Sequence, residues 1–181
     1  YYNIGECYEK LEEMDEARSY YKKATKLDPE LADAWFGIGV TLEYEERWFE
    51  SIHFFKKAIK LSGKNAEYWY ALGDAEAKLG NLDSAEKAYE KVLELDPENS
   101  YIWLDWAFAL FQHDKLEDAI DTIFEGLKTH ADMVEYYYLI AVYYFKINKY
   151  KEGSIYFEQA LSRDYNKYHI IFEYFPSLKN N

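Results

Sequence analysis

The sequence predicts an all-α protein built as a solenoid of stacked antiparallel helical hairpins. One observation is that residues 66–99 divide into two amphipathic halves, each with apolar residues at helical spacing. The other is that similar residue types return every 34 residues along the chain, with no insertion. A constant period of this length is typical of arrays in which each hairpin buries its apolar side against its neighbours.

The two halves of residues 66–99 are expected to be two helices joined by a turn at Leu79-Gly80-Asn81. Asp96-Pro97 should end the second helix, because proline has no N–H for the helix and restricts the residue before it. In the second copy, Ser62-Gly63 stands in place of Asp-Pro. Gly63 suits a helix C-terminal cap because glycine tolerates a positive φ.

Five columns of similar residues run through the five copies, and we expect them to form the core. The first helices supply an aromatic column and a small column: Tyr1, Trp35, Trp69, Trp103 and Tyr137, then Gly5, Gly39, Gly73, Ala107 and Ala141. The second helices supply three columns: Ala17, Ser51, Ala85, Ala119 and Gly153, then Tyr21, Phe55, Tyr89, Ile123 and Phe157, then Ala24, Ala58, Val92, Gly126 and Ala160. The aromatic side chains should fill the space between hairpins. The small residues at the Gly73 and Ala85 positions should let two helix backbones approach.

The period predicts a single array that spans residues 1–181, since a repeat array has one continuous core. Its expected repeats are a partial one at 1–31, then 32–65, 66–99, 100–133 and 134–167. Residues 168–181 should begin a sixth unit or form a terminal helix. Because the chain begins without methionine and inside its first repeat, we expect it to be a fragment whose native N-terminus is missing.

The composition indicates a soluble, acidic protein. The net charge of −13 argues against nucleic acid as a partner, because the phosphate backbone would be repelled, and it favours basic or neutral partners. No run of 18 apolar residues is present, so we expect no membrane span. The single cysteine, Cys7, cannot form an internal disulfide, which fits a reducing compartment and a cytoplasmic location.

The sequence gives little support to catalysis, a metal or a cofactor. The four histidines fall at different positions of different repeats, so the stacking brings no two of them together: His53, His113, His130 and His169. Cys7 should pack inward on a first helix, with no histidine at a fixed offset to activate it. We therefore expect a chain that is not an enzyme, with no catalytic residue, no metal and no cofactor.

At the repeated columns the chain resembles the tetratricopeptide repeat family, whose period is 34 residues. The match is strongest in residues 66–99 and weakens in the fourth and fifth copies, where alanine replaces the small glycine and Ala131 and Tyr165 replace the proline. The resemblance implies a right-handed superhelix whose first helices line a concave groove, and a function in binding other proteins.

Carried onto this chain, the family's groove positions are aromatic and acidic. They predict a ligand groove formed by Tyr2, Asn3, Glu6, Phe36, Val40, Tyr44, Tyr70, Asp74, Tyr101, Leu104, Asp105, Phe108, Phe111, Tyr138, Val142 and Phe145. The same positions also include three lysines and further acidic, small and apolar residues: Glu9, Lys10, Asp33, Gly37, Glu43, Glu67, Ala71, Ala77, Lys78, Gln112, Glu135, Leu139 and Lys146. Four groove positions hold phenylalanine, which has no polar group to favour contact with water. We therefore expect a partner or neighbouring repeats to bury these side chains: Phe36, Phe108, Phe111 and Phe145.

Three functions follow as hypotheses. The first is a scaffold that holds a peptide or protein segment with apolar or basic side chains in this groove. The second is self-association through apolar ends, near Tyr1-Tyr2 and at Ile170, Ile171, Phe172, Tyr174 and Phe175. The third is a recruiting region of a larger enzyme.

Chaperone-binding members of the family grip a terminal carboxylate with basic side chains and asparagine. Here only Asn3 matches that clamp, and the other clamp positions hold Phe36, Gly37, Val40, Glu67 and Ala71. Since no cation meets the carboxylate, we expect no binding of the acidic C-terminal tails of heat-shock chaperones.

Overall fold

Each half of each 34-residue copy forms one helix. The computed structural model describes residues 1–169 and 172, which contain ten α-helices, one short 3-10 helix and no strand. Residues 1–99 contain α1 (Tyr2–Lys10), α2 (Met14–Leu27), α3 (Ala32–Tyr44), α4 (Trp48–Leu61), α5 (Ala66–Lys78) and α6 (Leu82–Leu95). The later residues contain α7 (Tyr101–Gln112), α8 (Leu116–Thr129), α9 (Val134–Lys146), α10 (Tyr150–Arg163) and the 3-10 helix η1 (Tyr165–His169). The all-α prediction is confirmed.

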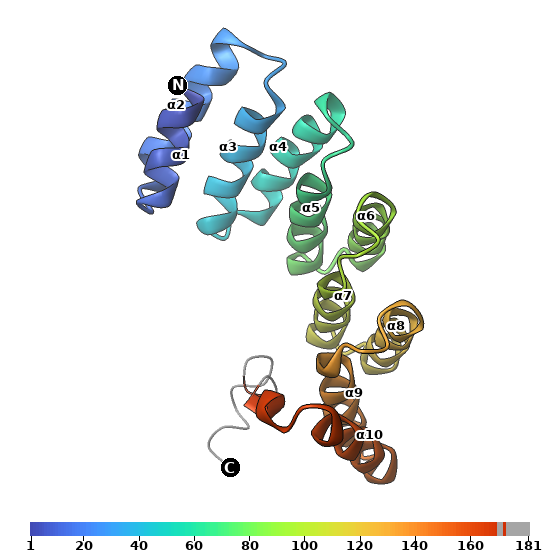
Figure 1. Ribbon diagram of the computed structural model, residues 1–181. Helices are drawn as coiled ribbons and strands as arrows, with labels where there is room; N and C mark the ends of the chain where they lie inside the picture. Colours follow the sequence, from blue (N-terminus) through green and yellow to red (C-terminus); the bar gives the residue numbers. More distant parts are fainter. Residues whose placement is uncertain (170–171, 173–181) are drawn as a thin grey trace. The chain divides into compact units, whose positions relative to one another are not determined.

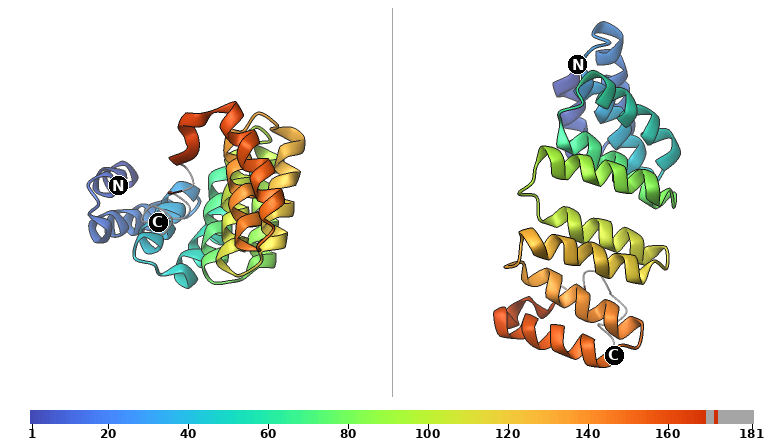
Figure 2. Two further views of the ribbon diagram at one scale, coloured as in Figure 1. Left: turned by 90° about the horizontal axis from the view of Figure 1, so that it is seen from below. Right: turned by 90° about the vertical axis from the view of Figure 1, so that its right-hand side faces the viewer.

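The chain divides into two compact units, unit 1 (Tyr1–Asn99) and unit 2 (Ser100–Asn181). Within unit 1, each helix from α1 to α6 packs against the next one in the chain (Figure 1). Unit 2 repeats this order from α7 to α10, and η1 then packs against α10 and α9. Figure 2 shows the paired helices of the hairpins from two further directions. Each unit is therefore a stack of helical hairpins, as the period predicts.

The small column accommodates aromatic rings. A Cβ atom built on Gly39 would lie 2.4 Å from the Phe55 ring of the same hairpin, and one on Gly73 would lie 2.9 Å from the Tyr89 ring. The first hairpin repeats the arrangement with Gly5 under the Tyr21 ring. The expectation that Gly73 lets two helix backbones approach is thus corrected, because the aromatic ring fills the space that the missing Cβ leaves.

Tryptophan side chains of the aromatic column also donate hydrogen bonds to the turn between repeats. Trp35 Nε1 donates a hydrogen bond to the Pro29 carbonyl oxygen at 2.8 Å, six residues earlier. Trp69 Nε1 donates to the Gly63 carbonyl oxygen, also at 2.8 Å, so the turn keeps this contact where proline is replaced. Gly63 does not have the positive φ expected of it, since Gly80 is the one glycine of the described residues with that conformation.

The turn between the two helices of every hairpin contains one residue with positive φ. These residues recur at the repeat period, with φ between 58° and 77°: Glu12, Glu46, Gly80, Asp114 and Asn148. Only the third repeat places glycine there, although the left-handed region costs other residues about 1–2 kcal/mol. The fixed geometry of the hairpin imposes this conformation on Glu12 and Glu46, which do not favour it, and on Asp114 and Asn148, which tolerate it better.

Because φ is positive at this turn residue, introducing glycine there should stabilise the protein, and removing glycine should destabilise it. We expect Glu46→Gly to stabilise the protein by up to about 1 kcal/mol, and Gly80→Ala to destabilise it by about 1 kcal/mol. Denaturant unfolding measures both changes. The control is Glu86→Gly inside α6, which should destabilise by about 1 kcal/mol because glycine is a poor helix former. Destabilisation by Glu46→Gly as well would contradict the argument.

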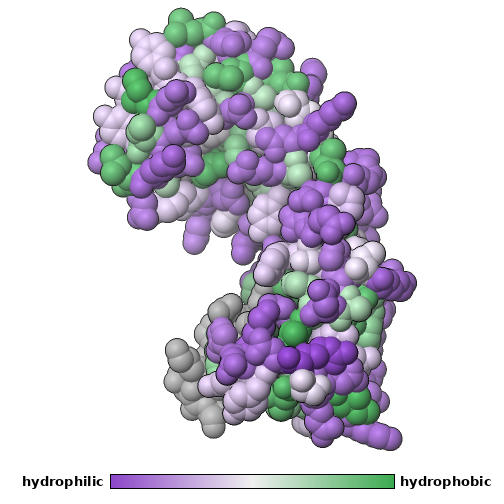
Figure 3. Space-filling view, viewed as in Figure 1, coloured by the Kyte–Doolittle hydropathy of each residue, from purple (hydrophilic) through white to green (hydrophobic). Residues whose placement is uncertain are grey.

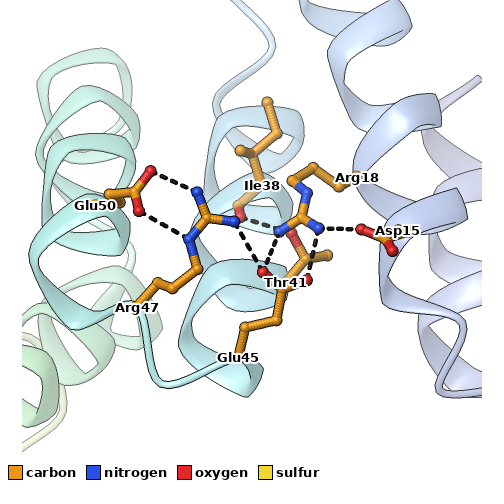
Figure 4. Close-up of polar contacts among 7 residues, drawn as sticks. All are labelled: Asp15, Arg18, Ile38, Thr41, Glu45, Arg47 and Glu50. Carbon is orange, nitrogen blue, oxygen red and sulfur yellow. Dashed lines mark hydrogen bonds and ion pairs between the residues drawn. The ribbon is translucent and has the colours of Figure 1, made fainter.

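An ion-pair network joins the first two hairpins (Figure 4). The guanidinium group of Arg18 on α2 donates two hydrogen bonds, of 2.8 and 2.6 Å, to the two carboxylate oxygens of Glu45 in the turn after α3. Arg47 donates to Glu45 at 2.9 Å and grips Glu50 with two further bonds. Hydrogen bonds from Arg18, and then from Arg47, lower the pKa of Glu45 to about 2.

This network should lose its effect in acid. The pKa of Glu45 is about 2 in the folded chain against an ordinary value of 4.5, so the contribution is complete above about pH 4.5 and is lost as pH falls towards 2. The measurement is the difference in unfolding free energy between the wild type and Glu45→Gln at a series of pH values. That difference should shrink over this range. A constant difference down to pH 2 would show that the ion pairs do not stabilise the fold.

Three further expectations concern single residues or the end of the chain. Cys7 is exposed, which corrects the inward position expected for it. None of the described helices is long and apolar enough to cross a membrane. Residues 170–171 and 173–181 lie outside the described residues, and with them most of the sixth unit and most of the apolar end proposed for self-association.

Candidate functional site

The first helices of unit 1 bring eight of the predicted groove positions together. Side chains from α1, α3 and α5 surround a pocket of about 170 Å³, which we call the acidic pocket. Its predicted residues are Tyr2, Glu6, Glu9, Asp33, Phe36, Gly37, Val40 and Glu67. We call the side of α1, α3 and α5 that carries the predicted groove residues the first-helix face of unit 1.

Tyr21 also lines the acidic pocket, although the sequence pattern assigns it to the core. It comes from α2 and is almost wholly buried. A Cβ atom on Gly5 or on Gly37 would lie 2.6 Å from its ring, so the ring fits between two glycines on neighbouring first helices. The sequence contained one indication that the Tyr21 ring lies here, which is the second glycine, Gly37. This glycine does not belong to the small column, so the column does not explain it.

Tyrosine hydroxyl groups hold three of the four carboxylates of the acidic pocket. Tyr21 donates to Glu9 Oε2 at 2.7 Å, and Tyr2 donates to Glu6 Oε1 at 3.2 Å. Burial and the hydrogen bond to Glu9 raise the pKa of Tyr21, so its hydroxyl remains a donor. Tyr68 of α5 donates to Asp33 in the same way. No basic side chain is among the residues that line the pocket.

The rest of the first-helix face is more open. Tyr44 is 57% exposed and Tyr70 is 37% exposed, and Asn3 is exposed as well.

Burial, and then the neighbouring Asp74 carboxylate, raise the pKa of Glu43 to about 7, while Lys78 opposes this shift. Glu43 is therefore partly protonated near neutral pH. Figure 3 shows hydrophilic residues over much of the visible surface of α1 to α6, with separate hydrophobic residues between them.

In unit 2 the predicted groove residues are less accessible. The structure buries three of them, Leu104, Tyr138 and Val142, so these side chains offer no accessible surface to a partner. The Tyr138 hydroxyl donates to the Asp164 carbonyl oxygen at 2.9 Å. Tyr101 is exposed, and Asp105 is half-buried.

The four phenylalanines without a polar tip are half-buried by their own chain. Phe36 lies 4.7 Å from the Tyr68 ring, and Phe111 stacks on Tyr143 at 5.3 Å, both measured between ring centroids. Phe108 lies beside Phe111, and Phe145 lies edge-on to the ring of Phe157. Packing within each unit therefore buries much of these four side chains. The sequence alone allowed their burial either by a partner or by neighbouring repeats.

The chain's own segment 164–169 lies against α9 in unit 2. Lys167 Nζ donates to Glu135 Oε1 at 2.8 Å, and Glu135 is only 7% exposed. In Figure 1, η1 lies beside α9 on the side away from α8. This contact and the one between Tyr138 and Asp164 show that the segment covers part of the predicted groove in unit 2.

The described residues contain no group of three or more histidine, cysteine, aspartate or glutamate side chains that could hold a metal ion. The Glu43 and Asp74 carboxylates form a pair, and Lys78 lies near them. This pair belongs to the first-helix face.

Comparison with known proteins gives a consistent assignment. Models of the family described as tetratricopeptide repeat match residues 1–31, 66–99 and 134–167, which together are more than half of the chain. No curated protein compared with the chain matches its sequence.

Solved structures share the fold at low sequence identity. A crystal structure of MamA is 22% identical, with a TM-score of 0.78, and the alignment covers 92% of this chain and 98% of MamA. YrrB, described as a TPR protein with an unusual peptide-binding site, is 19% identical with a TM-score of 0.72, covering 95% of this chain and 89% of YrrB. PilF of Pseudomonas aeruginosa is 18% identical with a TM-score of 0.69, covering 89% of this chain and 73% of PilF.

Proposed function

The chain belongs to the tetratricopeptide repeat family, and on this basis we propose that it is a protein-interaction scaffold that holds a segment of another protein on the first-helix face of unit 1. The single observation that carries this proposal is the acidic pocket, in which predicted groove residues from three first helices converge. Such a scaffold acts by binding and not by catalysis.

Two properties of this face favour a segment with apolar and basic side chains. Exposed Tyr44 and Tyr70 offer rigid, amphipathic contact surface, and tyrosine is enriched among residues that dominate binding energies. The carboxylates of the acidic pocket and the net charge of −13 attract a positively charged partner and repel nucleic acid. The peptide-binding site named for YrrB is in line with a peptide or protein segment as the partner.

Unit 1 is the better candidate because segment 164–169 contacts α9 in unit 2. A partner of unit 2 would have to displace contacts that the chain makes with itself. The first-helix face of unit 1 keeps exposed side chains on all three of its helices, with Asn3 on α1, Tyr44 on α3 and Tyr70 on α5.

The test is a peptide selected from a random displayed library on the full chain. Replacement of both Tyr44 and Tyr70 by serine should weaken its binding by at least about tenfold, since truncating a central interface aromatic costs more than about 1 kcal/mol. Calorimetry measures the affinity, and the helical circular dichroism should stay unchanged because both side chains are exposed.

The matched control is Phe49→Ser, which alters an aromatic residue of α4 that is 80% exposed. It should leave the affinity of the selected peptide unchanged. If the Tyr44 and Tyr70 variant binds every selected peptide as well as the wild type does, the first-helix face of unit 1 is not the binding surface.

A further inference from the structure

One position of the repeat carries a carboxylate in both units. The second residue of the 34-residue repeat reads Asp33, Glu67, Tyr101 and Glu135 in successive copies. In unit 2 the Glu135 carboxylate binds the ammonium group of Lys167 at 2.8 Å. The lysine comes from outside the helical hairpins, from the segment that lies on α9, so unit 2 already contains a lysine bound at this column.

Glu67 holds the same position in unit 1, two repeats earlier. Its side chain is exposed, and no hydrogen bond or ion pair within the described part of the chain reaches its carboxylate. Three more carboxylates line the same pocket, and each accepts a bond from a neutral tyrosine hydroxyl group. The pocket therefore contains Glu67, a carboxylate at the repeat position of Glu135, and no cation among the residues that line it.

We propose that the acidic pocket binds the ammonium group of a lysine side chain from the partner's segment, in the way that Glu135 binds Lys167. This proposal rests on the proposed function, because it assigns one side chain of the bound segment to one pocket. Glu67 pairs with the ammonium group, and Asp33, Glu6 and Glu9 add negative charge around it. The ring of Phe36 and the methyl groups of Val40 contact the aliphatic stem of the lysine, which packs on apolar surface while its charged end stays in a polar environment.

The experiment uses lysine-containing peptides selected from the random displayed library on the full chain. In each peptide, one lysine at a time is replaced by norleucine, which keeps the aliphatic stem and removes the charge. At one lysine, this replacement should weaken binding by at least about tenfold. Glu67→Gln should weaken the lysine peptide by a similar factor and leave the norleucine peptide unchanged.

Glu86→Gln is the matched control, since it removes the same charge from an exposed position on α6. It should change the affinity of neither peptide beyond the small loss expected from net charge. Loss of affinity that is equal for Glu86→Gln and Glu67→Gln would overturn the proposal, because general attraction would then explain the effect.

The outcomes distinguish failure of the lysine pocket from failure of the proposed function. If norleucine is tolerated at every lysine while the Tyr44 and Tyr70 variant still loses binding, the lysine pocket is wrong and the proposed function stands. If arginine at the same place binds tenfold more tightly than lysine, the pocket takes a guanidinium group and the proposal is overturned. If the Tyr44 and Tyr70 variant binds normally, or no peptide is selected at all, both are wrong.

Discussion

Replacing Phe55 by alanine should lower the free energy of unfolding by about 3–5 kcal/mol. Phe55 is fully buried, and its ring packs in one cluster with Ile52, Leu72 and Ala75. It also covers Gly39. Removing the ring loses the transfer free energy of its atoms and leaves a cavity between α3, α4 and α5, whose backbones are held by the rest of the stack. Chemical denaturation followed by helical circular dichroism measures the loss.

The matched control for this prediction is Phe49→Ala on the same helix. Phe49 is 80% exposed, so its removal should change the unfolding free energy by no more than about 0.5 kcal/mol. Both variants remove the same atoms from α4, and only their burial differs. If the two variants were equally stable, the buried column of Tyr21, Phe55 and Tyr89 would not be part of the core of unit 1.

The sequence was sufficient for the helices because each one repeats the same apolar pattern. The residue with positive φ in each turn was largely hidden, since glycine, which adopts this conformation without strain, occupies only position 80, and Asp114 and Asn148 are weaker indications. Glu46 gives no such sign, because its conformation is set by how α3 and α4 pack and not by its own preference. Gly63 shows the reverse case, in which a residue able to adopt positive φ does not need it.

The candidate site was predictable in unit 1 and less so in unit 2 for a related reason. The acidic pocket follows from positions that recur with the period, such as Asp33 and Glu67. The pairing of Lys167 with Glu135 occurs once, between residues that no period relates, so the sequence contains no pattern that predicts it. The burial of Tyr138 beside the Asp164 carbonyl group has the same origin.

The Gly39→Ala substitution should destabilise the protein by up to about 2 kcal/mol, because an overpacking cost of about 1–3 kcal/mol is set against a gain of about 1 kcal/mol in helix propensity. The new Cβ atom would lie 2.4 Å from Cε1 of Phe55, closer than carbon atoms can approach. Because the Phe55 ring is fully buried, it can move away only by disturbing its neighbours. This cost exceeds the gain of about 1 kcal/mol in helix propensity.

Phe55→Ile should remove this conflict, because isoleucine places fewer atoms over the small column. The fourth repeat already has that combination, with Ala107 and Ile123 both fully buried at the equivalent positions. In the Phe55→Ile background, Gly39→Ala should therefore be neutral or stabilising. A double-mutant cycle measured by denaturant unfolding should give a coupling energy of at least about 1 kcal/mol. If alanine at position 39 has the same effect in both backgrounds, the aromatic ring is not what keeps glycine in this column.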